Sequence, residues 1–144
     1  MRKIVLQVAL GVQSLHKQLI VHRDLKINNI LMSDYSEDAT VRIGDFGSAF
    51  KLTSPTDTSN FMIGTAGYVA PEILLGQSYS FSCDIWGLGC IMYTMFFAQC
   101  PFWSPDKKAR KIMVCSPDVS LDLDSNPLAA HLSDACKDLL TQLL

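Results

Sequence analysis

The sequence has 144 residues, a length that suits a single domain with its own hydrophobic core. Hydrophobic residues make up 49% of the chain and the formal net charge is −2, the composition of an ordinary soluble globular protein rather than of a strongly basic one. The largest basic cluster is formed by Lys107, Lys108, Arg110 and Lys111, is short and carries no interleaved aromatic residues. It indicates a solvated helix face, and we expect no nucleic-acid partner.

Residues 2–18 predict an amphipathic helix, because Ile4, Val8, Val12 and Leu15 recur on one helical face. The apolar start resembles a secretory signal, but no small-residue cleavage pattern follows it. Residues 19–21 predict a short extended segment. The apolar stretches Ile30–Met32 and Thr40–Ile43 are separated by the polar turn SDYSEDA and predict a β-hairpin.

Residues 45–72 are rich in Ser, Thr and Gly and predict a long loop, which in a compact domain usually serves function. Residues 85–98 predict a buried helix capped by Asp84. The uncharged run 85–105 is interrupted by Pro101 and is too short to span a membrane.

The rest of the chain predicts two helices and a loop. Residues 106–115 predict a short exposed helix and 116–127 a loop. Ser133 opens a final helix, in which Ala135, Leu139, Leu140 and Leu143 repeat at helical spacing.

The five cysteines are odd in number, with no C-x-x-C pair and no histidine at zinc-finger spacing. They are interpreted as buried or half-buried free thiols. We therefore expect an intracellular, cytoplasmic protein, with the nucleus as an alternative.

The segment HRDLKINN at residues 22–29 gathers groups suited to phosphoryl transfer. The carboxylate of Asp24 can orient a hydroxyl group and accept its proton, and the ammonium of Lys26 can neutralise a phosphate. The amide oxygen of Asn29 and the carboxylate of Asp45, in the segment DFG, are hard ligands suited to magnesium. An isolated HRD triplet would be a surface charge cluster, so the assignment depends on the complete set of motifs.

The ordered set is HRD with Asn29, DFG at 45–47, APE at 70–72, and D-x-W-x-x-G starting at Asp84. The chain is identified by it as a member of the protein kinase family. The resemblance implies the α+β protein kinase-like fold, here as the mostly helical C-terminal lobe with a short β-hairpin at the catalytic cleft. Residues 1–144 would run from the family's helix E to about its helix H, with the N-terminal lobe absent.

The same resemblance assigns roles to individual residues. Asp24 is the expected catalytic base, Lys26 contacts the γ-phosphate of ATP, and Asn29 and Asp45 hold the Mg²⁺ ions. Leu31 forms part of the apolar floor under adenine. His22 and Phe46 are expected to pack the catalytic loop against the DFG segment, and Asp84 to anchor the backbone of that loop.

Lys26, two residues after the catalytic aspartate, and Thr65, whose hydroxyl would bridge the base and the lysine, favour Ser/Thr over Tyr specificity. The segments GTAGYVAPE and PFW are similar to those of the calcium/calmodulin-dependent kinases. Ala66, Ile27 and Asn28 depart from that group's pattern. Calmodulin is left open as a partner through parts outside this chain, besides ATP and proteins with Ser/Thr acceptors.

Arg23 precedes the catalytic aspartate, as in kinases that are activated by phosphorylation of the activation segment, since an arginine there can pair with a phosphate. Phe61 stands three residues before Gly64, where related kinases often carry the phosphorylated threonine. The hypothesis is that Thr58 or Ser59 is the regulatory site.

The sequence has no Gly-rich loop, no V-A-I-K lysine and no partner arginine for Glu72. The favoured interpretation is a catalytic-domain fragment of an active Ser/Thr kinase that is inactive by itself, because ATP would be held from one side only. The alternatives are a pseudokinase, which would normally lack Asp24, Asn29 or Asp45, and a catalytically inactive truncated lobe that acts as an interaction or regulatory module.

Overall fold

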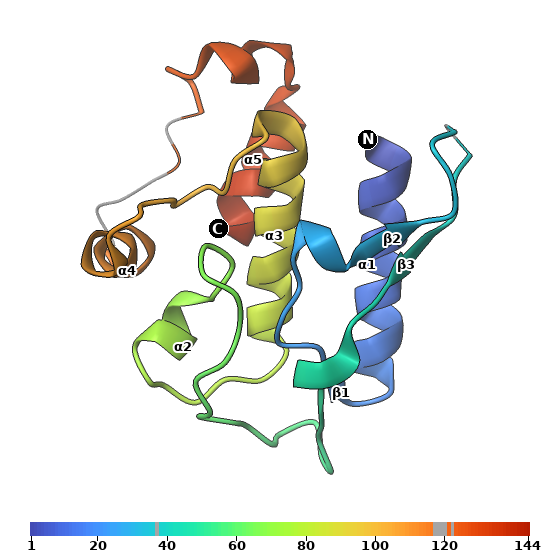
Figure 1. The fold of residues 1–144 in the computed structure, drawn as a ribbon, viewed down its shortest axis with the longest axis vertical. Coiled ribbons are helices and arrows are strands. Elements are labelled where there is room, and N and C mark those ends of the chain that lie inside the picture. The colour runs from blue at the N-terminus through green and yellow to red at the C-terminus, as the bar shows by residue number, and fades with distance from the viewer. Residues whose placement is uncertain (37, 117–120, 122) are drawn as a thin grey trace.

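The computed structural model describes residues 1–36, 38–116, 121 and 123–144. The described residues form a mostly helical fold with short two-stranded sheets, as the sequence predicts (Figure 1). The α-helices and strands are α1 (Arg2–Lys17), β1 (Ile20–Val21), β2 (Ile30–Met32), β3 (Val41–Ile43), β4 (Phe50–Lys51), α2 (Pro71–Leu74), α3 (Ser82–Phe97), α4 (Lys107–Cys115) and α5 (Asp134–Leu143). Short 3-10 turns cover Ile27–Asn29, Phe46–Ser48 and Pro127–His131.

Helix α3 is the centre of the fold, with α1 and the β2–β3 hairpin on one side and α5 on the other (Figure 1). Trp86, Leu88, Cys90 and Ile91 point in different directions around α3, and all are buried. A helix that is apolar around most of its circumference is stable only inside a core. Among the described residues, no helix is long and apolar enough to cross a membrane.

Helix α1 presents the predicted face to this core. Val8 and Val12 are buried against Leu25, Leu88 and Ile91, with Ile4 packed at the edge. The helix ends at Lys17, where Leu19 takes a positive φ of 61° and turns the chain into β1.

The predicted hairpin is present: β2 pairs antiparallel with β3, with Leu31 opposite Arg42. Its turn includes residue 37, which lies outside the described residues. The Gln7 side chain fastens the hairpin to α1, since it accepts a hydrogen bond from the Val41 amide and donates one to the Ala39 carbonyl.

The prediction of one long loop over 45–72 was partly wrong. Phe50 and Lys51 form β4, which pairs antiparallel with β1 through Val21 and Ile20. This pairing joins segments about thirty residues apart and leaves no periodic signal in a two-residue strand.

The cap assigned to Asp84 was also wrong. Helix α3 begins at Ser82 after Phe81, so Asp84 lies inside the first turn and no side chain caps the helix. Ser133 does cap α5, because its hydroxyl accepts a hydrogen bond from the Cys136 amide.

The inner face of α5 differs from the predicted one. Ala135 and Leu139 are exposed, whereas Leu140 is buried and Leu143 packs beside it on α3. Two of the four periodic positions therefore face solvent.

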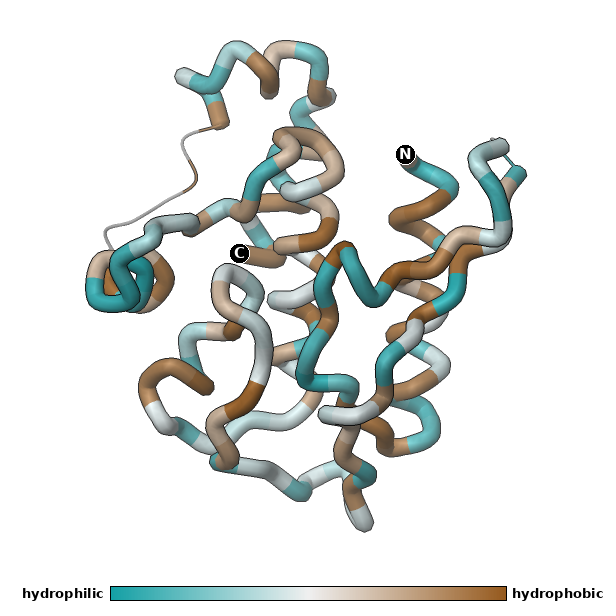
Figure 2. Tube along the Cα trace, viewed as in Figure 1, coloured by the Kyte–Doolittle hydropathy of each residue, from teal (hydrophilic) through white to brown (hydrophobic). Residues whose placement is uncertain are grey.

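Helix α4 is the predicted short helix, with hydrophilic (teal) and hydrophobic (brown) residues both visible along it in Figure 2. All five cysteines are free thiols, as predicted: Cys83 and Cys90 are buried, and the other three are half-buried.

Gly87 lies where α3 packs closely against the catalytic loop, so its substitution tests this packing. A Cβ atom there would lie 2.8 Å from the Leu25 Cβ and 3.2 Å from the Leu25 carbonyl oxygen. Gly87→Ala should therefore lower the free energy of unfolding by about 1–3 kcal/mol, because a backbone segment cannot move aside as a side chain can.

Gly11→Ala in α1 is the matched control, measured by denaturant unfolding of the protein at its full natural length. Its Cβ would meet only the end of the flexible Ile43 side chain at 2.9 Å, and alanine favours the helix. Equal effects of the two substitutions would contradict this account of the α3 packing.

Candidate active site

The catalytic loop is attached to α3 through the carboxylate of Asp84, which is fully buried. Its Oδ2 accepts a hydrogen bond from the His22 amide at 2.8 Å, and its Oδ1 accepts one from the Arg23 amide at 2.9 Å. His16 Nε2 lies 2.9 Å from Oδ2. A buried carboxylate is stable only with such partners, so the loop and the helix depend on each other. The anchoring role expected for Asp84 matches this geometry.

Arg23 and Asp45 take left-handed backbone conformations, with φ of 66° and 59°. Such conformations are strained for side chains other than glycine and persist where the surroundings enforce them. The conformation of Arg23 is enforced by the hydrogen bond that its backbone amide donates to the Asp84 carboxylate. Arg23 directly precedes Asp24, and Asp45 is itself one of the expected magnesium ligands.

Asp24, Lys26 and Thr65 come together although Thr65 is 41 residues from Asp24. Lys26 Nζ donates to Asp24 Oδ2 at 2.7 Å and to Thr65 Oγ1 at 2.9 Å. The Thr65 hydroxyl in turn donates to Asp24 Oδ1 at 2.6 Å. The bridge predicted from the sequence is therefore present, and both carboxyl oxygens are oriented.

These contacts determine the protonation of Asp24. Burial raises the pKa of its carboxyl, but the hydrogen bonds from Lys26 and Thr65 and the charge of Lys26 outweigh burial and hold the pKa below its ordinary value. The group is thus a carboxylate at neutral pH. It accepts hydrogen bonds strongly and is a weak base.

Asn29 and Asp45 are neighbours because the Gly44 amide donates to the Asn29 carbonyl at 2.8 Å. The Asn29 side-chain amide donates to the Asp24 carbonyl at 2.8 Å, which fixes its orientation. One amide oxygen and one carboxylate are too few to enclose an ion. Within the described part of the chain, no three His, Cys, Asp or Glu side chains form a metal cluster. The pair fits magnesium that retains water and phosphate ligands.

The packing residues expected around these groups also lie at the site. The His22 ring meets the Phe46 ring edge-on at 5.1 Å between centroids, and its Nε2 donates to the Gly44 carbonyl at 3.0 Å. His22 is fully buried, as expected for a packing residue. Leu31 lies on β2 with 56% of its surface exposed, available to an apolar ligand.

Arg23 and the activation segment make contacts within the protein that the sequence did not indicate. Arg23 Nε donates to the Ser48 carbonyl at 2.6 Å, and the guanidinium lies 5.3 Å from the centre of the Phe50 ring. Ser59 forms a two-way backbone bridge with Tyr79, and the Tyr79 hydroxyl donates to the Phe61 carbonyl at 2.7 Å. Tyr79 thus fixes the backbone around Ser59 and Phe61, and the hypothesis that Thr58 or Ser59 is the regulatory site stays a prediction.

Glu72 also has a partner that the sequence did not indicate. The Ser82 hydroxyl donates to Glu72 Oε1 at 2.7 Å. Sequence reasoning likewise missed His16 and Tyr79. Their partners are distant in the chain, so no local pattern could have revealed them.

The match to the protein kinase domain model covers residues 1–144, and the chain therefore belongs to the protein kinase domain family. It is 38% identical to the serine/threonine-protein kinase PLK1 of Xenopus tropicalis over 88% of this chain and 21% of that protein. It is 42% identical to the serine/threonine-protein kinase polo of Drosophila melanogaster over 70% of this chain and 17% of that protein. It is 33% identical to the serine/threonine-protein kinase PLK4 of Nematostella vectensis over 99% of this chain and 14% of that protein.

The chain thus spans between about a seventh and about a fifth of the length of these curated relatives. They are polo and polo-like serine/threonine kinases. The predicted similarity to the calcium/calmodulin-dependent group finds no support in them, and neither does calmodulin as a partner. The segment GTAGYVAPE covers nine residues, whereas the matches to these relatives extend over 70–99% of the chain.

The lowered pKa of Asp24 makes stability depend on pH. A carboxyl with a folded-state pKa below its unfolded value of about 3.9 stabilises the fold above that value, and the contribution is lost as the pH falls through the folded-state pKa. Thr65→Val removes one of the bonds that lower the pKa. At pH 7 the variant should be less stable by about 1 kcal/mol.

This stability difference should shrink as the pH falls below about 4. Protonation of the Asp24 carboxylate lowers the free energy of unfolding of the wild type more than that of the variant. Denaturant unfolding of the full-length protein at several pH values measures it. A difference that stays constant from pH 7 to pH 3 would show that Thr65 does not act on the Asp24 carboxylate.

Proposed function

We propose that the protein transfers the γ-phosphoryl group of ATP to serine or threonine hydroxyl groups of proteins. The observation that carries this proposal is the hydrogen-bonded cluster of Asp24, Lys26 and Thr65. The names of the relatives, all serine/threonine kinases, support the same acceptor class.

The cluster supplies what in-line phosphoryl transfer needs from a protein, namely position and charge. The Asp24 carboxylate accepts a hydrogen bond from the hydroxyl group of the substrate serine or threonine. It takes the proton of that hydroxyl group as the bond between the hydroxyl oxygen and phosphorus forms. At the same time the bond from phosphorus to the leaving ADP oxygen breaks. Lys26 is placed to stabilise the negative charge on the γ-phosphate during this step. Thr65 keeps both side chains in this arrangement.

Asn29 and Asp45 would hold magnesium, and Leu31 would contact adenine. When bound, magnesium neutralises charge on the phosphates of ATP. The Asn29 side chain donates a hydrogen bond to the Asp24 carbonyl, which links the expected magnesium ligand to the expected base. The two residues would therefore move together.

We propose further that the chain is the C-terminal lobe of an intracellular kinase, from the family's helix E to about its helix H. The exposed apolar surfaces of Leu31 (56%) and Phe46 (47%) beside the cleft support a covering lobe. The alternative of an inactive interaction module is not favoured, because Asp24, Lys26 and Thr65 are all present and hydrogen-bonded to one another.

Asp24→Asn should reduce kcat by about 10³-fold while changing KM little, since the amide can neither take the proton nor accept the same hydrogen bonds. The measurement is transfer of labelled phosphate from ATP to peptides by the protein at its full natural length. Phosphoserine or phosphothreonine, and no phosphotyrosine, should form.

Asp34→Asn is the matched control, because Asp34 lies on the exposed turn of the β2–β3 hairpin and, among the described residues, accepts hydrogen bonds from nearby Ser33 and Ser36. It should retain wild-type turnover. Full activity of the Asp24→Asn variant would refute the proposal.

A further inference from the structure

The activation segment, residues 45–72, is fastened to the core of the fold by Tyr79, which precedes helix α3. Ser59 and Tyr79 exchange two backbone hydrogen bonds, each of 2.8 Å. The Tyr79 hydroxyl adds a third bond by donating to the Phe61 carbonyl at 2.7 Å. We call these three hydrogen bonds the Tyr79 clamp. They join two segments of the chain that are about twenty residues apart.

Tyr79 is a rigid support for this clamp. The residue is buried in one core cluster with Ile73, Trp86 and Phe102. A tyrosine hydroxyl in such a position needs a hydrogen-bond partner, and here the activation segment provides it. If the segment moved away, the hydroxyl and the backbone groups bonded to Ser59 would lose their partners, at a cost in free energy. The core therefore favours the arrangement in which the segment lies against it.

The clamp is close in the chain to the catalytic cluster. Phe61 stands four residues before Thr65, whose hydroxyl donates to Asp24 at 2.6 Å. Between them, Gly64 has a φ of 117°, and a Cβ atom there would lie 3.3 Å from the Arg23 carbonyl oxygen. An extended chain covers at most roughly 3.3–3.6 Å per residue, so a link of four residues leaves little freedom between two fixed ends. The position of Phe61 therefore restricts the position of Thr65.

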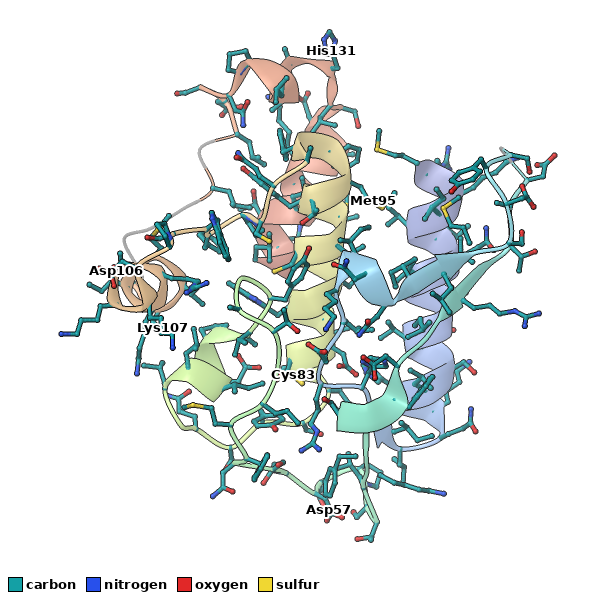
Figure 3. The ribbon with its side chains drawn as sticks, viewed as in Figure 1. Asp57, Cys83, Met95, Asp106, Lys107 and His131 are labelled. Atoms are coloured by element: carbon teal, nitrogen blue, oxygen red, sulfur yellow. The ribbon has the colours of Figure 1, made fainter. Side chains whose placement is uncertain are left out.

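The residues before the clamp form a turn around the carboxylate of Asp57, which lies at the bottom of the molecule in Figure 3. Its Oδ2 accepts hydrogen bonds from the Thr53 amide, the Thr53 hydroxyl and the Ser54 amide. The bonds from Thr53 and Ser54 hold the pKa of the Asp57 carboxyl below its ordinary value. The turn thus carries a negative charge next to Thr58. A phosphate on Thr58 would meet like-charge repulsion there.

Neutral groups also occupy the other positions at which a phosphate would act. Phe61 has no hydroxyl group, and the Ser59 hydroxyl already accepts a hydrogen bond from the Phe61 amide at 3.2 Å. The Arg23 guanidinium donates to the Ser48 carbonyl at 2.6 Å and lies 5.3 Å from the centre of the Phe50 ring. The activation segment is therefore ordered by contacts within the protein.

We infer that Tyr79 is a positioning residue for the proposed phosphoryl transfer, and that its hydroxyl orders the activation segment in place of a phosphate. This inference rests on the proposed function for the reaction. Tyr79 touches no reacting atom and acts through the segment that carries Thr65. Because the hydroxyl is part of the folded chain, the segment needs no prior phosphorylation to bring Thr65 to Asp24.

The test compares Tyr79→Phe with the wild type at full natural length, after a protein phosphatase has removed phosphate from both and mass spectrometry has verified the removal. The wild type should keep its kcat/KM toward a serine peptide after this treatment. Tyr79→Phe should lower kcat/KM about fivefold, as expected for the loss of one hydrogen bond. Binding of a fluorescent ATP analogue should not change, because Asn29, Leu31 and Asp45 lie outside the clamped residues. A purely structural role would lower the unfolding temperature and leave kcat/KM of the folded protein unchanged.

Tyr93→Phe is the matched control, because it removes the hydroxyl of another buried tyrosine, which packs in a separate core cluster with Phe97 and Leu140. It should retain the wild-type kcat/KM. An equal loss in both variants would overturn the inference. Loss of wild-type activity on dephosphorylation would also overturn it and would favour Thr58 or Ser59 as the regulatory site.

Amide hydrogen exchange at Ser59 separates this inference from the proposed function, because it reports the clamp without phosphoryl transfer. The Ser59 amide should exchange about fivefold faster in dephosphorylated Tyr79→Phe than in the wild type, and at the wild-type rate in Tyr93→Phe. This result, with no turnover of any peptide, would support the clamp and refute the reaction. Peptide turnover with equal exchange and equal kcat/KM in the wild type and Tyr79→Phe would do the reverse.

Discussion

The carboxylate of Asp84 is the constraint on which the rest of the site depends. It is fully buried in the first turn of α3 and would be unstable there without partners. The amides of His22 and Arg23 supply two of these partners and His16 a third. The most buried helix thereby fixes the backbone of the loop that carries Asp24.

The fixed backbone has consequences for the chemical groups. Arg23 is held in a left-handed conformation, which an unconstrained chain would leave. The next residue, Asp24, is then directed toward Lys26 and Thr65, and the Asn29 side chain closes the loop by donating to the Asp24 carbonyl. Positioning contributes most of the rate in phosphoryl transfer, so a loop held in this way is where the proposed chemistry is expected.

The parts of the structure that the sequence predicted are those with a local cause. The apolar face of α1, with Val8 and Val12 buried, and the pairing of β2 with β3 follow from periodicity and turn residues within a short window. Asp24, Lys26 and Asn29 could be assigned to one site because they lie within six residues of one another, whereas their chemical roles rest on the family resemblance and stay predictions.

The parts that were wrong or missed depend on distant contacts. The pairing of β1 with β4 is set by tertiary packing, and so is the His16 contact to Asp84, which joins residues 68 positions apart. Asp84 looked like a helix cap because an aspartate before an apolar helix usually is one. In the fold its oxygens face the catalytic loop instead. The polo-like similarity could not be read from short shared segments and required comparison along most of the chain.

Amide hydrogen exchange at His22 and Arg23, resolved by residue in the full-length protein, tests the central claim most directly. If Asp84 holds the catalytic loop, both amides should exchange as slowly as those of buried α3 residues such as Ile91, although they lie in a loop. Exchange as fast as that of the exposed turn residue Ser36 would contradict the account.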